Sequence, residues 1–224
     1  MKTKKVILTI MALLLACLTI TTTVSATSPP YPGGASGQSQ SGTGSVNTTS
    51  LETTTGRIKM FGQCVCGVWQ SGSTNSWGQY ECAYYTATQT RSMSFFTNVQ
   101  YQGAIHIRAD SYFLGGGSSA YASVYQILTV YDTSNWQVIA QDSHQIYDKT
   151  VQASGVSSQG DDKSFNGDVI SQSVYFTAQQ GHTYVARVRV SCNSQAAAYL
   201  TAAANSYYDF WGSRYVQINE ISHT

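Results

Sequence analysis

Charged side chains are scarce in this chain of 224 residues. Asp, Glu, Lys and Arg make up only 10% of it, where soluble domains usually carry about a quarter. Without its first 26 residues the chain holds 9 basic and 11 acidic residues, and the basic ones are scattered. Because nucleic-acid binding needs clustered Lys and Arg, this composition predicts no nucleic-acid partner. It predicts a surface of Ser, Thr, Gln, Asn, Gly and Tyr.

Common catalytic motifs are missing as well. The sequence has no Gly-x-Ser-x-Gly and no His-Glu-x-x-His, and the glycine run at 115–117 lacks the Gly-Lys-Ser/Thr of a phosphate loop. A glycosidase needs two carboxylates, and only Glu52, Glu81 and Glu220 are glutamates. Glu81, which lies among aromatic residues, is the one candidate acid. The sequence therefore favours a non-catalytic protein, with a hydrolase on a jelly-roll scaffold as the less favoured alternative.

Proline is confined to a short stretch at 29–32. That stretch opens a segment rich in Ser, Thr and Gly, residues 27–55, which has almost no apolar content. Such a segment buries too little surface to fold by itself. It predicts a disordered linker that leads into a single folded domain at 56–224.

The first 26 residues have the pattern of a secretory signal peptide. Lysines at 2, 4 and 5 precede the apolar run 6–18, and Val24-Ser25-Ala26 is a small-x-small cleavage site. The sequence therefore predicts a secreted or cell-surface protein. Two alternatives would attach it to a membrane: an uncleaved signal segment, or lipidation at Cys17, which ends a lipobox-like Leu-Leu-Ala-Cys.

Four cysteines follow the signal segment: Cys64, Cys66, Cys82 and Cys192. An even number in an exported chain predicts two disulfides. Cys64 and Cys66 are two residues apart on a predicted strand, which leaves their Cα atoms near the outer limit for a bridge, so each would pair with Cys82 or Cys192. Cys66–Cys82 with Cys64–Cys192 is slightly favoured. A zinc site is the alternative, although Cys-x-Cys is not its usual spacing.

The clearest secondary structure is a predicted β-hairpin at 174–192 that turns at Gly181. Its second strand alternates strictly, which is typical of a half-buried antiparallel strand. The predicted inward residues are Tyr184, Ala186, Val188, Val190 and Cys192. Residues 120–131 are apolar on both faces, so they form either a doubly covered strand or one with an exposed stripe of Tyr121, Tyr125 and Tyr131.

Further strands are predicted at 57–61, 64–70, 77–87, 92–99, 104–113, 136–140, 195–204 and 207–221, with loops at 71–76 and 148–168. About nine or ten strands without an amphipathic helix predict a two-layer antiparallel β-sandwich of jelly-roll type. Leu128–Asp132 and Phe176–Tyr184 resemble a strand-turn and a hairpin of secreted β-sandwich modules appended to bacterial and archaeal hydrolases.

Two sets of residues are candidates for binding. Aromatic side chains stack on sugars and anchor interfaces, and the candidates are Trp69, Trp77, Trp136, Trp211, Tyr207, Tyr208 and Tyr215. Acidic side chains near glycines suit a structural calcium ion, and those candidates are Asp161, Asp162, Asn166 and Asp168. No other cofactor is expected.

These patterns together predict an exported, non-catalytic module that binds a carbohydrate, a cell-surface polymer or a protein. The alternative is a structural subunit of an envelope or appendage, which would associate through an exposed edge strand.

Overall fold

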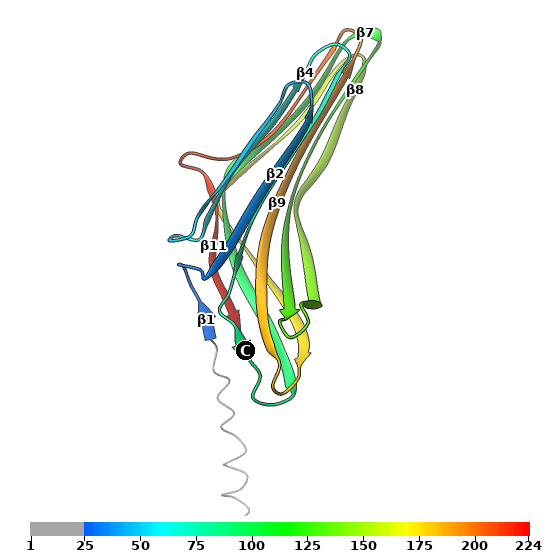
Figure 1. Cartoon of the computed structure of the whole chain (residues 1–224). Helices are drawn as coiled ribbons and strands as arrows, with labels where there is room; N and C mark the ends of the chain where they lie inside the picture. The colour runs from blue at the N-terminus through cyan, green and yellow to red at the C-terminus, as the bar shows by residue number, and fades with distance from the viewer. Residues whose placement is uncertain (1–24) are drawn as a thin grey trace, which may run out of the picture.

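The computed structural model describes residues 25–224, of which 82% lie in strands and none in a helix (Figure 1). Within this range no helix is long and apolar enough to cross a membrane. Apart from its last two residues, the predicted signal peptide, with Cys17, lies outside the described part. The strands are β1 (Ser25–Thr27), β2 (Gly33–Gly42), β3 (Ser45–Glu52), β4 (Arg57–Cys66), β5 (Gln70–Glu81), β6 (Tyr85–Thr86), β7 (Arg91–Asp132), β8 (Gln137–Ala178), β9 (Thr183–Tyr199), β10 (Ala202–Phe210) and β11 (Tyr215–His223).

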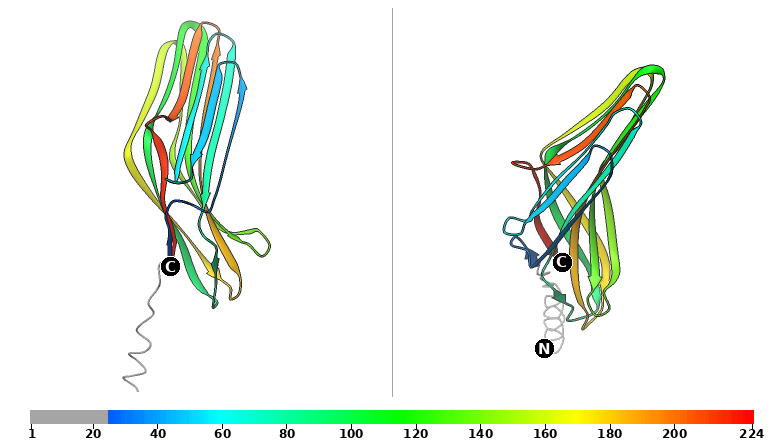
Figure 2. Two further views of the ribbon diagram at one scale, coloured as in Figure 1. Left: turned by 60° about the vertical axis from the view of Figure 1, so that its left-hand side comes forward. Right: turned by 45° about the horizontal axis from the view of Figure 1, so that its top comes forward.

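The longest strands, β7 and β8, form one long hairpin, and this hairpin is bent near its middle. Residues 91–112 of β7 pair with 156–178 of β8, and residues 117–132 pair with 137–154. Between these two blocks the register breaks, and Gly155 takes a φ of 66°. The two halves of the hairpin therefore belong to different layers (Figure 2).

Each half of the hairpin is extended by further antiparallel strands. Layer A consists of residues 156–178 of β8 and 91–112 of β7, followed by β10 with β11, then β4 and β3. Layer B consists of residues 137–154 of β8 and 117–132 of β7, followed by β9, β5 and β2. The predicted two-layer antiparallel sandwich is confirmed.

The space between the layers is filled by alternate residues of each strand. On β9 the five residues predicted to face inward are all at most 2% exposed. Buried tyrosine hydroxyls need partners in such a core, and they find them across it. The Tyr101 hydroxyl donates to Gln126 Oε1 at 2.9 Å, and the Tyr208 hydroxyl donates to Ser76 Oγ at 2.8 Å.

The predicted hairpin at 174–192 is corrected. Gly181 does sit in a turn, with a φ of 82°. However, β8 pairs only with β7, and β9 pairs with β5, β6 and β7. The segment between Ala178 and Thr183 therefore carries the chain from layer A to layer B. Alternation identified both strands, but it carries no information about their partners.

The predicted linker at 27–55 is also corrected, because it supplies β2 and β3. β2 pairs with β5 over its whole length, and β3 pairs with β4. Both lie at one edge of the sandwich, where they need few apolar residues. The Asn47 amide of β3 joins the two layers there, donating to the Ser39 carbonyl at 2.7 Å and to the Asn75 carbonyl at 3.0 Å. The folded domain therefore begins well before residue 56.

Three smaller predictions were wrong for a related reason. The predicted loops at 71–76 and 148–168 lie within β5 and β8. The predicted break at Gly62 lies inside β4, where the glycine leaves room for the Tyr208 ring. In each case the polar or glycine content reflects a strand whose neighbours do not require bulky side chains.

The two predicted disulfides are absent. Cys64, Cys66, Cys82 and Cys192 are free and buried. Cys66 and Cys82 lie at opposite ends of β5, a strand of 12 residues that spans roughly 40 Å, whereas a disulfide holds its Cα atoms within about 7 Å. The Cys82 sulfur instead accepts a hydrogen bond from the Ala186 amide at 3.1 Å, and the Cys66 thiol donates to the Ala196 carbonyl at 3.3 Å.

Thiol titration tests this arrangement. We expect no reaction of the four cysteines with iodoacetamide in the folded protein, because each is at most 2% exposed, and four alkylated cysteines after denaturation without reductant. Non-reducing peptide mapping that recovers a cystine between any two of them would contradict it.

Candidate binding face

The seven aromatic candidates do not form one surface. Tyr208 is fully buried in the core, so the prediction that it contacts a ligand is corrected. On layer A, Tyr207 stacks on His106 with ring centroids 5.2 Å apart, and the Arg57 guanidinium lies 4.1 Å from the Tyr215 ring centroid. Trp69, Trp136 and Trp211 lie in turns, 66%, 55% and 39% exposed.

Trp77 is the candidate that lies on the outer face of layer B. The Arg189 guanidinium covers its ring at 4.3 Å from the centroid. On β2, a Cβ placed on Gly37 would come within 2.7 Å of the indole nitrogen. Because Gly37 has no side chain, the half-buried indole lies close to the neighbouring backbone, and its position is fixed by both contacts.

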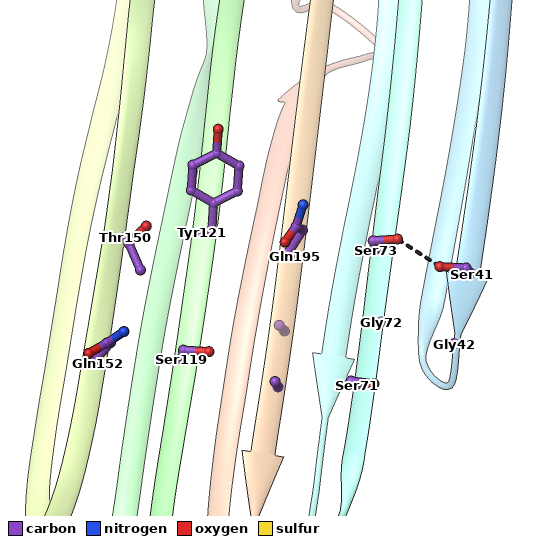
Figure 3. A pocket seen from close by; sticks show the side chains of 12 residues that line it. Ser41, Gly42, Ser71, Gly72, Ser73, Ser119, Tyr121, Thr150, Gln152 and Gln195 are labelled. Atoms are coloured by element: carbon purple, nitrogen blue, oxygen red, sulfur yellow. Dashed lines mark hydrogen bonds between the residues drawn. The ribbon is translucent and has the colours of Figure 1, made fainter.

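A row of polar side chains crosses all five strands of layer B about 13 Å from Trp77, the rise of four residues. Pairing aligns Tyr121 with one residue on each neighbouring strand; in order of strand position the row is Thr150, Tyr121, Gln195, Ser73 and Ser41. These side chains line a depression of about 660 Å³, in which Tyr121 stands upright and Ser73 bonds to Ser41 (Figure 3).

Amides and hydroxyls connect this depression to Trp77. The Asn193 amide donates to Ser123 Oγ at 3.1 Å and its carbonyl accepts from the Asn75 amide. Nearby, the Tyr125 hydroxyl donates to the Asp148 carboxylate. That hydrogen bond raises the pKa of Tyr125 to about 12, so the tyrosine stays neutral.

We call this surface the layer B face, defined by Ser73, Trp77, Tyr121, Tyr125, Arg189, Asn193 and Gln195. Six of its residues were not among the sequence candidates, and one of these six, Ser73, fell in a predicted loop. One signal in the sequence did point to this face: the stripe of Tyr121, Tyr125 and Tyr131. The strand that carries it was predicted to be either covered on both faces or exposed on one. The structure places Tyr121 and Tyr125 on the outside of layer B, half-buried among polar neighbours.

The four calcium candidates lie along β8, and two of them have separate partners. Asp161 accepts from the Tyr147 hydroxyl at 2.7 Å and from Lys149 at 3.3 Å, contacts that lower its pKa, and Asp162 pairs with His106. As neighbours on a strand, these two aspartates point to opposite faces. Within residues 25–224, no three Asp, Glu, His or Cys side chains gather as a metal would require. Calcium binding stays a prediction.

The candidate catalytic acid, Glu81, is held in an ion pair. Arg187 Nε donates to its carboxylate at 2.9 Å, and the Arg187 guanidinium also lies 4.7 Å from the Tyr131 ring centroid. The Glu81 carboxylate therefore already accepts hydrogen bonds from Arg187.

No protein-family model matches this chain, and no curated protein matches it. Several solved structures are similar at low identity. The chain is 10% identical to the CBM22-1–GH10 modules of a Clostridium thermocellum xylanase complexed with xylohexaose, covering 84% of this chain and 26% of that one, with a TM-score of 0.20.

It is 9% identical to the CBM22-1 xylan-binding domain of a Paenibacillus barcinonensis protein, covering 87% of this chain and 93% of that one, with a TM-score of 0.21. It is 11% identical to the K1 cleaved adhesin domain of Lys-gingipain from Porphyromonas gingivalis, covering 90% and 98%, with a TM-score of 0.23. Structural neighbours thus include carbohydrate-binding modules, at TM-scores too low to carry a function across.

Proposed function

We propose that the layer B face binds a carbohydrate chain. The observation that carries the proposal is the continuous row of outward polar residues that lines the 660 Å³ depression beside Tyr121. Sugar hydroxyls both donate and accept hydrogen bonds, and the side chains of Gln195, Asn193 and Ser73 do the same. The aromatic rings add flat apolar area on which a sugar ring can stack.

Arg189 supplies the charged group of this face. Its guanidinium lies over Trp77, and its buried Nε has no hydrogen-bond partner among residues 25–224. Arg187, by comparison, is paired with Glu81. An arginine fork held flat on an indole suits a hydroxyl pair or a carboxylate on the ligand. The face therefore offers stacking, neutral hydrogen bonding and one cation along a path several strands wide.

A glycan array probed with the chain from Ser25 onward tests the proposal. We expect specific binding that falls at least about tenfold in Trp77→Ala and Tyr121→Ala, since each loses a stacking surface worth about 1.5 kcal/mol. Trp211→Ala, in the β10–β11 turn of layer A, is the control and should bind normally. The proposal would be refuted if the wild-type protein bound neither soluble nor insoluble glycans, or if all variants bound equally.

The alternative function, a structural subunit, rests on the free edge of β8. This strand of 42 residues pairs only with β7. It carries charges along its length, which protect an edge from pairing with another chain: Asp142, Asp148, Lys149, Asp161, Asp162, Lys163 and Asp168. Because charge disfavours edge-to-edge association, we rank this alternative second.

A further inference from the structure

One end of the molecule is built from the connections between the two layers. The chain crosses between layers there five times, at 43–44, 67–69, 113–116, 155 and 200–201. Both β1 and the C-terminus lie toward the other end (Figure 1). The crossing turns come from five distant parts of the sequence and together form a single tip.

Large apolar side chains gather on three of these crossings. We define the apolar tip as six residues: Val68, Trp69, Phe113, Leu114, Tyr199 and Leu200. They are 37–84% exposed, with Leu114 the most exposed. Trp69 meets Tyr199 edge-on at 6.0 Å between ring centroids. A cleft of about 320 Å³ opens among Val68, Trp69, Phe113 and Leu200. These four residues and Tyr199 therefore form one continuous apolar surface, and Leu114 follows Phe113 directly in the chain.

Two of these residues hold an unfavourable backbone conformation. Trp69 has a φ of 60° and Leu200 a φ of 52°, while the crossings at 44 and 155 carry glycine at φ of 70° and 66°. A bulky residue in the left-handed region costs about 1–2 kcal/mol relative to the usual conformation. Glycine would relax both turns, yet the chain places a tryptophan and a leucine there with their side chains in solvent.

Charge is absent from the chain around the tip. All five segments that pass through it, residues 33–51, 60–80, 111–131, 150–160 and 190–208, contain no Asp, Glu, Lys or Arg. The nearest charged residue along the chain is Asp110, which is 9% exposed and bonded to Arg108 at 2.9 Å. The end of the molecule is therefore neutral as well as apolar.

We propose that the apolar tip inserts into the interfacial region of a lipid bilayer. Trp and Tyr favour that region, where an apolar ring and a polar atom are both accommodated. A narrow end with protruding Leu114 and Trp69 suits insertion among headgroups, and its neutrality removes the cost of desolvating a charge. This route is separate from the signal segment and from Cys17, and it is independent of the layer B face.

Co-sedimentation with phosphatidylcholine vesicles tests the proposal, using the chain from Ser25 onward. This part holds every core residue, from Tyr31 to Ile221. We expect binding that is the same at low and high salt, since no charge at the tip takes part. Trp69→Gly and Leu200→Gly should each lower partitioning about tenfold, because each removes a large apolar side chain.

Stability separates insertion from a packing role. Both glycine variants relieve a positive φ, so their melting temperatures should stay level or rise. Trp136→Gly is the matched control: Trp136 is 55% exposed at a φ of 56° in the β7–β8 turn, away from the tip. It should bind vesicles normally.

Three results would overturn the proposal: wild-type protein that does not sediment with vesicles, tip variants that sediment like wild type, and binding lost at high salt. A dimer in sedimentation velocity that both tip variants abolish would assign the tip to a second copy instead.

Discussion

Raising the pH to about 11 in the presence of reductant is expected to unfold this protein. Four of the buried ionisable groups are Tyr101, Tyr208, Cys82 and Cys192. Burial raises the pKa of each, to about 11 for Cys82 and further for the other three. The folded state therefore keeps protons that the unfolded state releases.

The direction of the effect follows from the raised values. An unfolded thiol ionises near pH 8.5 and an unfolded tyrosine near 10. The stabilisation is complete below those values and is lost as the pH rises toward the folded values. In that window each group lowers the free energy of unfolding by about 1.4 kcal/mol per pH unit. By about pH 11 the loss is several kcal/mol, against a total stability on the order of 10 kcal/mol.

Urea unfolding between pH 8 and 11, followed by tryptophan fluorescence, measures this slope. Tyr101→Phe should be less stable at neutral pH, because Gln126 loses the bond from its hydroxyl, but its stability should fall less steeply with pH. Tyr175→Phe is the control, since Tyr175 is 77% exposed. Equal slopes for all three proteins would show that buried tyrosine does not set the alkaline limit.

Gly62→Ala is expected to destabilise the protein strongly, because it adds a methyl group to the core side of layer A. A Cβ at residue 62 would lie 2.2 Å from the hydroxyl and Cζ of Tyr208. Tyr208 is fully buried and bonded to Ser76 at 2.8 Å, so its ring has nowhere to move. Overpacking costs about 1–3 kcal/mol and a broken buried hydrogen bond about as much again. Thermal unfolding should show a loss of several degrees.

A double-mutant cycle isolates that contact. Tyr208→Phe removes the hydroxyl, one of the two atoms nearest the new methyl, so the combined Gly62→Ala/Tyr208→Phe variant should lose less stability than the two single changes summed. Gly67→Ala serves as the control, because its Cβ would meet only the Gln70 side chain at 3.6 Å. Simple additivity would mean that the Tyr208 hydroxyl is not what makes Gly62 necessary.

Sequence alone reached the fold class because burial alternates clearly on the central strands. Tyr184 through Cys192 satisfied a period of two, and the structure buries all five inward residues. The same reasoning missed β2, since an edge strand of Gly, Ser and Gln buries little and is held by backbone hydrogen bonds to β5. The disulfide prediction failed because Cys66 and Cys82 are close in sequence but lie at opposite ends of β5.

The two exposed surfaces were harder to predict than the fold. Trp77 was a candidate, but its partner Arg189 lies more than a hundred residues away and is aligned only by the pairing of β5 with β9. Trp69 was also a candidate, whereas Phe113, Leu114 and Leu200 were not, because these residues are far from Trp69 in the sequence and nothing in the sequence marks them as its neighbours. Only the layer crossings bring them together.

The strand order also fixes when the molecule can assemble. β9 lies between β7 and β5 in layer B, and β10 lies between β7 and β4 in layer A. The centre of both layers is therefore made last, by residues 183–223. During synthesis the β7–β8 hairpin, the β3–β4 pair and the β2–β5 pair can each form early, but they are joined into layers only when β9, β10 and β11 are in place. Most of the polypeptide is therefore synthesised before either layer can be completed, so the early strand pairs stay without their central neighbours for much of that time.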